Sequence, residues 1–287
     1  MPKTNYKPTK RRKIHQTRRK KHNLRRWIFL LILGISLIFT GFYLKNKIAF
    51  YYAMHFHKHT EQNLKNSKTE AARIEKIITE YNDKTFGFDI SHYQKKEDIK
   101  WDSLTIANDG INLEFVVMRA TMGKKKKDKH FDEFWEKAKE NKLIRGAYHF
   151  YRADEDPVMQ ANNYLESVKL ETGDLRPVLD IERVPRRKSH EKFIEDLKVW
   201  LKIVEEKYGK KPIIYTYYHY YKDYLKGEIN DYPLWLANYN DVMMPSPEDD
   251  WKMWQFTENG IVKGINTKVD LNIYNGNLWS FKSLTLD

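Results

Sequence analysis

The sequence predicts an α/β protein whose main part is an irregular, TIM-like β/α barrel, preceded by an N-terminal transmembrane helix and a helical stalk. Three observations predict this fold: a long uncharged run near the N-terminus, a polar segment with apolar residues at helical spacing, and short β-rich runs that alternate with amphipathic stretches. The predicted parts are a basic arm (1–26), a transmembrane helix (27–44), a stalk (45–84) and a barrel (85–287).

The composition supports a sizeable core and restricts the partners. Of the 287 residues 41% are hydrophobic, and the formal net charge is +13. Residues 1–26 contain 12 Lys or Arg and no acidic residue, which leaves 40 basic and 39 acidic residues for the rest of the chain. Because the excess charge is confined to the arm, we expect no nucleic-acid partner. The absence of cysteine excludes a disulfide, a thiolate nucleophile and a Cys-ligated metal.

Residues 27–44 read WIFLLILGISLIFTGFYL, which is 18 residues without a charge. As a helix they would span about 27 Å at roughly 1.5 Å per residue, close to the thickness of a bilayer core. Trp27 and Tyr43 stand near the two ends, where amphipathic rings prefer the headgroup level, and the basic arm predicts a cytoplasmic N-terminus. We therefore expect a single-pass membrane protein whose barrel is extracytoplasmic.

Both N-terminal features have alternative interpretations. A cleaved signal peptide would have a shorter apolar region followed by a small-x-small site, whereas this chain continues as KNKIAFYYAMHFHK, which favours an uncleaved anchor. The arm has a second interpretation as a patch for anionic lipid or nucleic acid. A membrane span beside the arm already explains its charge as an orientation signal.

Residues 45–84 are largely polar but carry apolar residues at helical spacing, which predicts a helical stalk between anchor and barrel. These apolar residues are Leu64, Ala71, Ile74, Ile77, Ile78 and Tyr81. His55, His57 and His59 alternate in this segment and could bind a metal, but the neighbouring aromatic and lysine residues favour ordinary juxtamembrane polar residues. The body has no HxH or HExxH spacing, and we expect neither a metal nor another cofactor.

Eight short β-rich runs follow, separated in part by helical stretches, as in a parallel sheet or barrel. They read FGFDI (86–90), FVVMRA (115–120), IRGAYHFY (144–151), PVLDIE (177–182), PIIYTYY (212–218), PLWLANY (233–239), MWQF (253–256) and VDLNIY (269–274). The clearest helical face, between the fourth and fifth runs, ends at Gly209, a C-cap position. Asp156 and Pro157 open an earlier helix, and Phe131 lies at the start of another. The later runs have little helix between them, which predicts an irregular barrel.

Polar residues are expected at the downstream ends of these runs: Asp89 after FGF, His149 after GAY, Asp180 and Glu182 after PVL, and Asp270 after Val269. In a parallel barrel the downstream ends of all strands share one rim, where active sites are assembled. Asp180 and Glu182 are two residues apart, so in a strand they would point to the same side at about 6.6 Å spacing, with Ile181 packed behind. The alternative is a surface loop in which the two acids pair with nearby arginines.

Eight blocks, in this order, resemble the glycoside hydrolase family 25 muramidases, the Chalaropsis-type lysozymes. The blocks are FGFDISHYQ (86–94), MRATMG (118–123), GAYHFYR (146–152), PVLDIE (177–182), KPIIYTYY (211–218), LWLANY (234–239), WQF (254–256) and VDLN (269–272). The resemblance covers residues 85–280 and implies an irregular β/α barrel with fewer outer helices than strands. It also implies a peptidoglycan substrate, cut at the β-1,4 bond from N-acetylmuramic acid to N-acetylglucosamine, and no obligate protein partner.

The resemblance extends to individual residues. Glu182 matches the general acid and Asp180 the partner carboxylate two residues earlier. Asp89 matches the aspartate that ends the first strand, and Asp270 the aspartate of the last strand. Four further positions match residues that contact the sugar or line the cleft: Tyr217, Tyr148, Trp254 and Gln255. The chain departs from the family pattern in the basic loop KKKKDKH (124–130) and in IYNG (273–276), neither of which contains the four acids.

Cleavage of a glycosidic bond needs one neutral carboxyl group that donates a proton and another that is ionised. Crowding acids into a partly dry cleft separates their pKa values in this way. The hypothesis is that Glu182 is the protonated acid, that Asp180 and Asp270 are ionised stabilisers, and that Asp89 orients the network or the sugar. The resemblance favours participation of the substrate's 2-acetamido group, with net retention of configuration.

Three rival functions remain open at this point. A chitinase-like hydrolase also places a D-x-E motif at a strand end, but its pattern has a further Asp where this chain has Val178. A barrel that binds the cell wall without catalysis and a metal-dependent hydrolase are the others. The basic run Lys124 to Lys127 either steers the protein to anionic wall polymers or is a solvated loop. His92 and His149 are interpreted as hydrogen-bonded structural residues.

Overall fold

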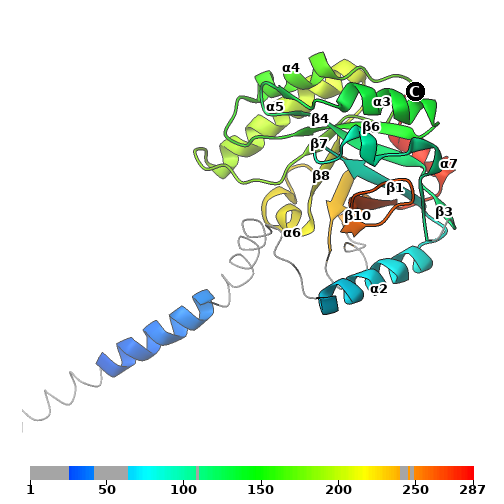
Figure 1. Ribbon diagram of the computed structural model, residues 1–287. Coiled ribbons are helices and arrows are strands. Elements are labelled where there is room, and N and C mark those ends of the chain that lie inside the picture. The colour runs from blue at the N-terminus through cyan, green and yellow to red at the C-terminus, as the bar shows by residue number, and fades with distance from the viewer. Residues whose placement is uncertain (1–25, 42–63, 108–109, 240–244, 246–248) are drawn as a thin grey trace, which may run out of the picture. The chain divides into compact units, whose positions relative to one another are not determined.

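The computed structural model describes residues 26–41, 64–107, 110–239, 245 and 249–287 (Figure 1). The chain forms two compact units, Met1–Ser67 and Lys68–Asp287. In the first unit, residues 26–41 form a helix. Among the described residues, no helix combines the length and the apolar character needed to cross a membrane. The basic arm up to residue 25, the last part of the predicted span and the three alternating histidines lie outside the described residues.

The second unit contains the eight predicted strands and three further strands of two residues each. The strands are β1 (Thr85–Ile90), β2 (Thr105–Ile106), β3 (Ile111–Asn112), β4 (Phe115–Met122), β5 (Lys126–Lys127), β6 (Ile144–Phe150), β7 (Val178–Asp180), β8 (Ile213–Tyr217), β9 (Leu234–Ala237), β10 (Trp251–Gly260) and β11 (Val269–Tyr274). The helices and helical turns are α2 (Leu64–Glu80), η1 (Lys96–Asp98), η2 (Trp101–Ser103), α3 (Phe131–Glu140), α4 (Pro157–Ser167), α5 (His190–Tyr208), α6 (Tyr218–Tyr220), η3 (Tyr221–Leu225), α7 (Leu278–Phe281) and η5 (Lys282–Leu284).

The main sheet closes into a barrel. Its order is β1-β11-β10-β9-β8-β7-β6-β4-β5, and a further pairing of β1 with β4 joins the two ends. Since β5 pairs only with β4, eight strands form the barrel wall (Figure 1). The predicted irregular barrel is therefore confirmed. The expectation that its strands are all parallel is wrong for β11, which runs antiparallel to both β1 and β10.

Helices α3, α4 and α5 pack outside the strands, and the start of α4 and the end of α5 agree with the capping signals of the sequence. The Asp156 side chain accepts a hydrogen bond from the backbone N–H of Met159 (2.8 Å), and Pro157 occupies the first position of α4. Helix α5 ends at Gly209, whose φ of +68° lies in the left-handed region that glycine adopts without a steric penalty. The predicted helix from Phe131 is α3.

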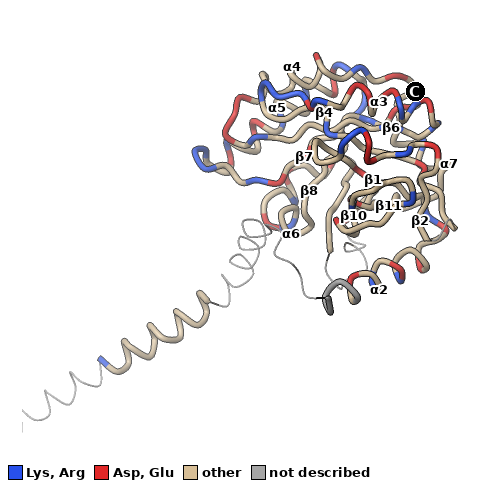
Figure 2. The backbone as a smooth tube through the Cα atoms, viewed as in Figure 1, with Lys and Arg blue, Asp and Glu red and all other residues tan. Residues whose placement is uncertain are grey.

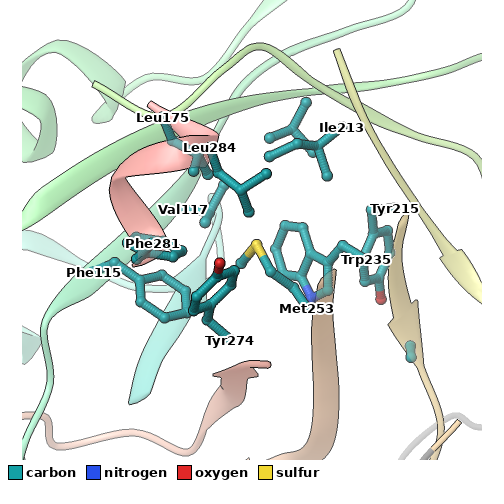
Figure 3. Packing of buried hydrophobic residues seen from close by; sticks show 12 residues of the cluster. Phe115, Val117, Leu175, Ile213, Tyr215, Trp235, Met253, Tyr274, Phe281 and Leu284 are labelled. Carbon is teal, nitrogen blue, oxygen red and sulfur yellow. The ribbon is translucent and has the colours of Figure 1, made fainter. Parts of the chain in front are cut away.

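The end of the barrel interior next to α7 is apolar (Figure 3). Phe115 at the start of β4 packs on Phe281 of α7 with ring centroids 4.8 Å apart, and Tyr274 at the end of β11 packs on the same ring at 4.8 Å. Met253 and Trp235 continue this cluster, and both are almost fully buried. Helix α7 therefore fills one end of the barrel interior.

Helix α2 lies within the predicted stalk (45–84), and from Glu70 onward its side chains pack against the barrel. Arg73 Nη2 donates to the backbone oxygen of Phe256 (2.7 Å) and also contacts Glu70 Oε1 (2.7 Å). Thr257 Oγ1 donates to Glu70 Oε1 (2.9 Å). The Tyr81 ring meets Trp254 edge-on, with centroids 5.9 Å apart. Residues outside the resemblance to family 25 thus support β10.

Candidate active site

The four predicted carboxylates lie together at the open end of the barrel. Asp89 is near the end of β1 and is paired in register with Asp270, near the start of β11. Because β11 is antiparallel, its first residues lie at the rim where the parallel strands end. Asp180 ends β7, and Glu182 follows it. All four line a cavity of about 50 Å³, together with Tyr148, Tyr215 and Trp235.

The backbone of the β7 end directs Asp180 and Glu182 into this cavity. The backbone N–H of Ile181 donates to the oxygen of Tyr215 (2.9 Å), and Thr216 Oγ1 donates to the oxygen of Ile181 (2.6 Å). The Ile181 side chain is buried on the other side, as the alternation of a strand requires. Asp180 is 4% exposed, and its Oδ1 has no hydrogen-bond partner in the described part of the chain.

The arginines that follow the motif do not form the predicted alternative, a surface ion pair with these acids. The Arg183 guanidinium lies over the Phe150 ring, 5.6 Å from its centroid. The backbone N–H groups of Arg186 and Arg187 bind Asp154 instead (3.0 and 2.9 Å). In the described residues the two acids of the motif therefore face the cavity without an ion pair.

Two side-chain amides bind Asp89. Gln255 Nε2 and Asn272 Nδ2 both donate to Asp89 Oδ2, at 2.7 and 2.8 Å. Trp235 Nε1 donates to Asn272 Oδ1 (2.9 Å), and Tyr215 Oη donates to Gln255 Oε1 (2.8 Å). An indole N–H can only donate, so it fixes the amide of Asn272 with its oxygen toward Trp235 and its NH₂ toward Asp89. The network therefore requires Asp89 Oδ2 to be an acceptor.

This geometry places the proton of the Asp89–Asp270 pair on Asp270. Burial raises the pKa of Asp89, but hydrogen bonds from Asn272, Gln255 and Asp270 limit the increase, so that the pKa is about 6. Desolvation raises the pKa of Asp270 well above its usual range, and the charges of Asp89 and Glu258 add to the increase. These directions of the two pKa values favour Asp89 as the ionised member, in contrast to the expectation that Asp270 is an ionised stabiliser.

Asp180 and Glu182 also have raised pKa values. Desolvation raises the pKa of Glu182 to about 7, and Asp89 and Glu258 contribute to the increase against the opposing charges of Arg183 and Arg119. Desolvation and the neighbouring Glu182 raise the pKa of Asp180 well above its usual range, contrary to the expectation of an ionised group. Several acids in one cavity cannot all be charged at neutral pH, as the sequence reasoning required.

The structure separates the four predicted substrate-contacting residues. Tyr148 lines the cavity. Tyr217 is partly exposed, and the charge of the nearby Glu182 is the largest cause of the raised pKa of the Tyr217 hydroxyl. Trp254 is a wrong prediction: its side chain is fully buried, and its Nε1 donates to the backbone oxygen of Asn238 (3.1 Å). Gln255 is 1% exposed, so it orients Asp89 from below and does not form part of the cleft surface.

Sequence reasoning missed several residues of the site. Asn272 could have been found, since it lies two residues after Asp270 and so on the same side of the strand, by the argument used for Asp180 and Glu182. Trp235 and Tyr215 gave no signal, because aromatic residues in apolar runs are more often core. Three residues of the site that the prediction omitted are Asn272, Trp235 and Tyr215.

His149 is structural, as predicted. It is fully buried, its Nδ1 lies 2.7 Å from Thr121 Oγ1, and its Nε2 lies 3.2 Å from Gln160 Oε1. Burial lowers its pKa to about 4, so it stays neutral at physiological pH. No group of three or more His, Cys, Asp or Glu side chains within the described residues is arranged to hold a metal ion.

Comparisons with known proteins find similar sequences and similar folds. Residues 88–265 match the family described as glycosyl hydrolases family 25. The chain is 37% identical over 191 residues to the uncharacterized protein YegX of Escherichia coli (strain K12), covering 66% of this chain and 69% of YegX. The structure of a family 25 glycosyl hydrolase from Bacillus anthracis is 28% identical, with a TM-score of 0.63 over 71% of this chain and 95% of that one. A bacterial lysozyme from Streptomyces coelicolor is 26% identical, with a TM-score of 0.62 over 70% and 97%.

Proposed function

The chain belongs to the glycosyl hydrolases of family 25, and we propose that it is a peptidoglycan hydrolase, an N-acetylmuramidase of the lysozyme type. The bond cleaved is the β-1,4 bond between N-acetylmuramic acid and N-acetylglucosamine. The observation that carries this proposal is the cavity lined by Asp89, Asp180, Glu182 and Asp270, in which amide donors keep one acid ionised while its neighbours are protonated. This is the division of roles that glycoside hydrolysis needs.

Glu182 is the general acid in the proposed mechanism. With a pKa of about 7 it is still largely protonated just below neutral pH and can transfer its proton to the departing glycosidic oxygen. Asp89, held ionised by Gln255 and Asn272, supplies negative charge beneath the sugar ring. That charge stabilises the oxocarbenium-like transition state.

The resemblance to family 25 supports attack on the anomeric carbon by the oxygen of the substrate's own 2-acetamido group. Asp180 is suited to assist this step, because its Oδ1 is buried without a partner among the described residues and can accept the acetamido N–H. Water then attacks the anomeric carbon, and Glu182, now ionised, accepts its proton. The configuration at the anomeric carbon is retained overall.

Mass spectrometry of the fragments released from purified peptidoglycan tests the proposed bond. Muramidase action leaves N-acetylmuramic acid at each new reducing end, which borohydride reduction marks as muramitol. Reducing ends of N-acetylglucosamine would contradict the proposal, as would the absence of any fragments. The Glu182→Gln variant, isosteric and unable to donate the proton, serves as the matched control.

Val178 argues against the rival interpretation, a chitinase-like hydrolase. This residue is fully buried in β7, so the position that would carry a further carboxylate lies in the apolar interior. The four carboxylates that line the cavity argue against a barrel that binds the wall without catalysis. Incubation with chitin oligosaccharides separates the hydrolases, since a muramidase that requires the lactyl ether leaves them intact.

We also propose that residues 27–44 anchor the protein in a membrane, with the basic arm in the cytoplasm and the barrel on the other side. The support is the length of the uncharged run, the positive charge that precedes it, and a helix over residues 26–41 whose large apolar side chains, such as Trp27 and Phe39, are exposed. Wild-type protein should stay in the membrane pellet after an alkaline carbonate wash. A Leu33→Arg, Leu37→Arg double variant should be released, and wild-type protein in the supernatant would contradict the anchor.

The absence of cysteine allows a direct test of orientation. Single variants Thr9→Cys, in the arm, and Ser283→Cys, at an exposed position of the barrel unit, each introduce one thiol. A membrane-impermeant maleimide added to intact cells should label Ser283→Cys alone, and lysis should expose Thr9→Cys. The reverse pattern would contradict the proposed orientation.

A further inference from the structure

Basic side chains concentrate on three loops that are distant in the sequence: residues 123–130, 151–156 and 183–189. Together the loops hold ten Lys or Arg and four Asp or Glu, whereas the chain after residue 26 has 40 basic and 39 acidic residues in all. These loops, here called the basic surface, therefore carry a net charge of +6, whereas the rest of the chain after residue 26 has 30 basic and 35 acidic residues. Figure 2, with Lys and Arg in blue, allows these positions to be followed along the backbone.

The three loops adjoin one another through backbone hydrogen bonds. Asp154 accepts from the N–H groups of Arg186 and Arg187 (3.0 and 2.9 Å), which ties the second loop to the third. Glu155 Oε2 accepts from the N–H of Lys124 (2.8 Å), which ties the second loop to the first. The carboxylates of Asp154 and Glu155 thus hydrogen-bond to backbone N–H groups and connect the loops. The side chains of the neighbouring cations are left to face solvent.

Most of these cations are exposed and form no ion pair with a carboxylate in the described part of the chain. They are Lys124, Lys125, Lys126, Lys129, Arg186 and Arg187. Exposed cations with mobile side chains recognise repeated charge along a polymer better than a single phosphate group, which requires a fixed and partly buried donor set. The three loops present no exposed aromatic ring, since Tyr151 is 1% exposed, so stacking on nucleic-acid bases is not provided for.

The basic surface also borders the catalytic cavity. Its loops follow β4, β6 and β7, so it lies at the same end of the barrel as the acids. Arg183 is adjacent in sequence to Glu182, and its charge acts on the carboxyl groups of both Glu182 and Asp180. A glycan strand in the cavity therefore passes beside the basic surface, where substituents of the same strand can meet it.

We propose that the basic surface binds a linear polyanion carried by the wall glycan, namely a phosphodiester-linked polymer attached to the substrate, and directs hydrolysis to strands that bear it. This inference rests on the proposed function, because it places the glycan in the cavity. Electrostatic binding of this kind concentrates substrate at the cleft and weakens with added salt.

Binding is tested apart from hydrolysis with the Glu182→Gln protein in full-length form. It should sediment with purified walls at low salt, and removal of the phosphodiester polymers with cold hydrofluoric acid should reduce its affinity about tenfold, an effect lost at about 0.5 M salt. Equal binding to stripped and unstripped walls would overturn the proposal. Substitution of Lys124, Arg186 and Arg187 by Gln that weakens binding to phosphatidylglycerol vesicles as much as binding to walls would also overturn it, in favour of a membrane partner.

Hydrolysis is tested with the variant Lys124→Gln, Arg186→Gln, Arg187→Gln and a control of equal charge change on the outside of α5, Lys198→Gln, Lys202→Gln, Lys207→Gln. The first variant should cleave polymer-bearing walls about tenfold more slowly at low salt and cleave stripped walls at the wild-type rate. The control should match wild type on both. Equal losses in the two variants would overturn the proposal. Absence of muramitol from wild-type digests would instead refute the proposed function and leave the binding result standing.

Discussion

The two sides of the catalytic cavity hold their acids in different ways. On one side, here called the braced side, Asp89 and Asp270 lie on the adjacent strands β1 and β11. Asp89 accepts hydrogen bonds from the side-chain amides of Gln255 and Asn272, and this pair of hydrogen bonds is here called the brace. On the open side, Asp180 and Glu182 leave β7 beside each other, and among the described residues Asp180 Oδ1 has no partner. Amide donors do not titrate, so the braced side fixes where negative charge resides. On the open side, Glu182 keeps a proton that it can transfer to the substrate.

This difference shows how one rim can hold both a permanent charge and a transferable proton. Burial raises the pKa of every acid in the cavity, and hydrogen bonding to the charged form decides which of them ionises first. Trp235 therefore matters to the charge of Asp89 although it does not touch it, because the indole sets the direction of the Asn272 amide.

Removing the transferable proton should have the largest effect. The Glu182→Gln variant keeps the size and polarity of the side chain but cannot act as an acid, so kcat on peptidoglycan should fall by about 10³-fold, within the range typical of general acid catalysis. Release of reducing sugar from purified walls measures the loss. A folded variant that retains more than a tenth of the wild-type rate would remove Glu182 from this role.

Adding a charge to the braced side should have the next largest effect. Asn272→Asp retains an acceptor for Trp235 but replaces the donor to Asp89 with a carboxylate, so the two acids repel and the pKa of the pair rises. Activity at neutral pH should fall about 100-fold, and the acidic limb of the pH profile should move to higher pH. The control Asn275→Asp makes the same change at an exposed position after β11 and should retain activity. Equal activity of the two variants would contradict the brace.

The acids of the two sides should give separate limbs in the pH profile of the wild-type protein. Activity requires an ionised Asp89, with a pKa of about 6, and a protonated Glu182, with a pKa of about 7. The rate should therefore rise as pH increases through about 6, fall as it increases through about 7, and be highest between them. In the Asn272→Asp profile the acidic limb should shift further than the alkaline limb, and equal shifts would contradict separate assignments.

The raised pKa of Glu182 also predicts a pH-dependent stability. The folded protein binds this proton more tightly than the unfolded chain, so the group costs no stability below pH about 4, and its cost grows until the pH passes about 7. Glu182→Gln should then raise the unfolding free energy by on the order of 1 to 3 kcal/mol at pH 8 and by much less at pH 4. Urea unfolding at the two pH values measures the difference, and equal gains at both would argue against desolvation of Glu182.

The sequence predicted the eight strands and the gathering of the four acids, because alternation within a strand and the rim of a barrel are local and topological rules. It could not predict the direction of β11, since VDLNIY has the same pattern in a parallel or antiparallel strand. It could not predict the brace either, because the contact between Trp235 and Asn272 depends on how β9, β10 and β11 are aligned. Trp254 was misassigned because its neighbour Gln255 is the residue that faces the acids.

The smallest predicted effect concerns a part of the chain outside the match to family 25. Arg73 of α2 binds the backbone oxygen of Phe256, one residue after the Gln255 that braces Asp89. In Arg73→Ala the Phe256 carbonyl loses this donor and Glu70 keeps only Thr257, so the protein should lose about 1 to 2 kcal/mol of stability. The activity should fall severalfold with the acidic limb of the pH profile displaced, because a looser β10 binds Asp89 less well. Lys76→Ala, at an exposed position on the same helix, should change neither. A stability loss without any change in the pH profile would show that α2 supports the barrel but not the brace.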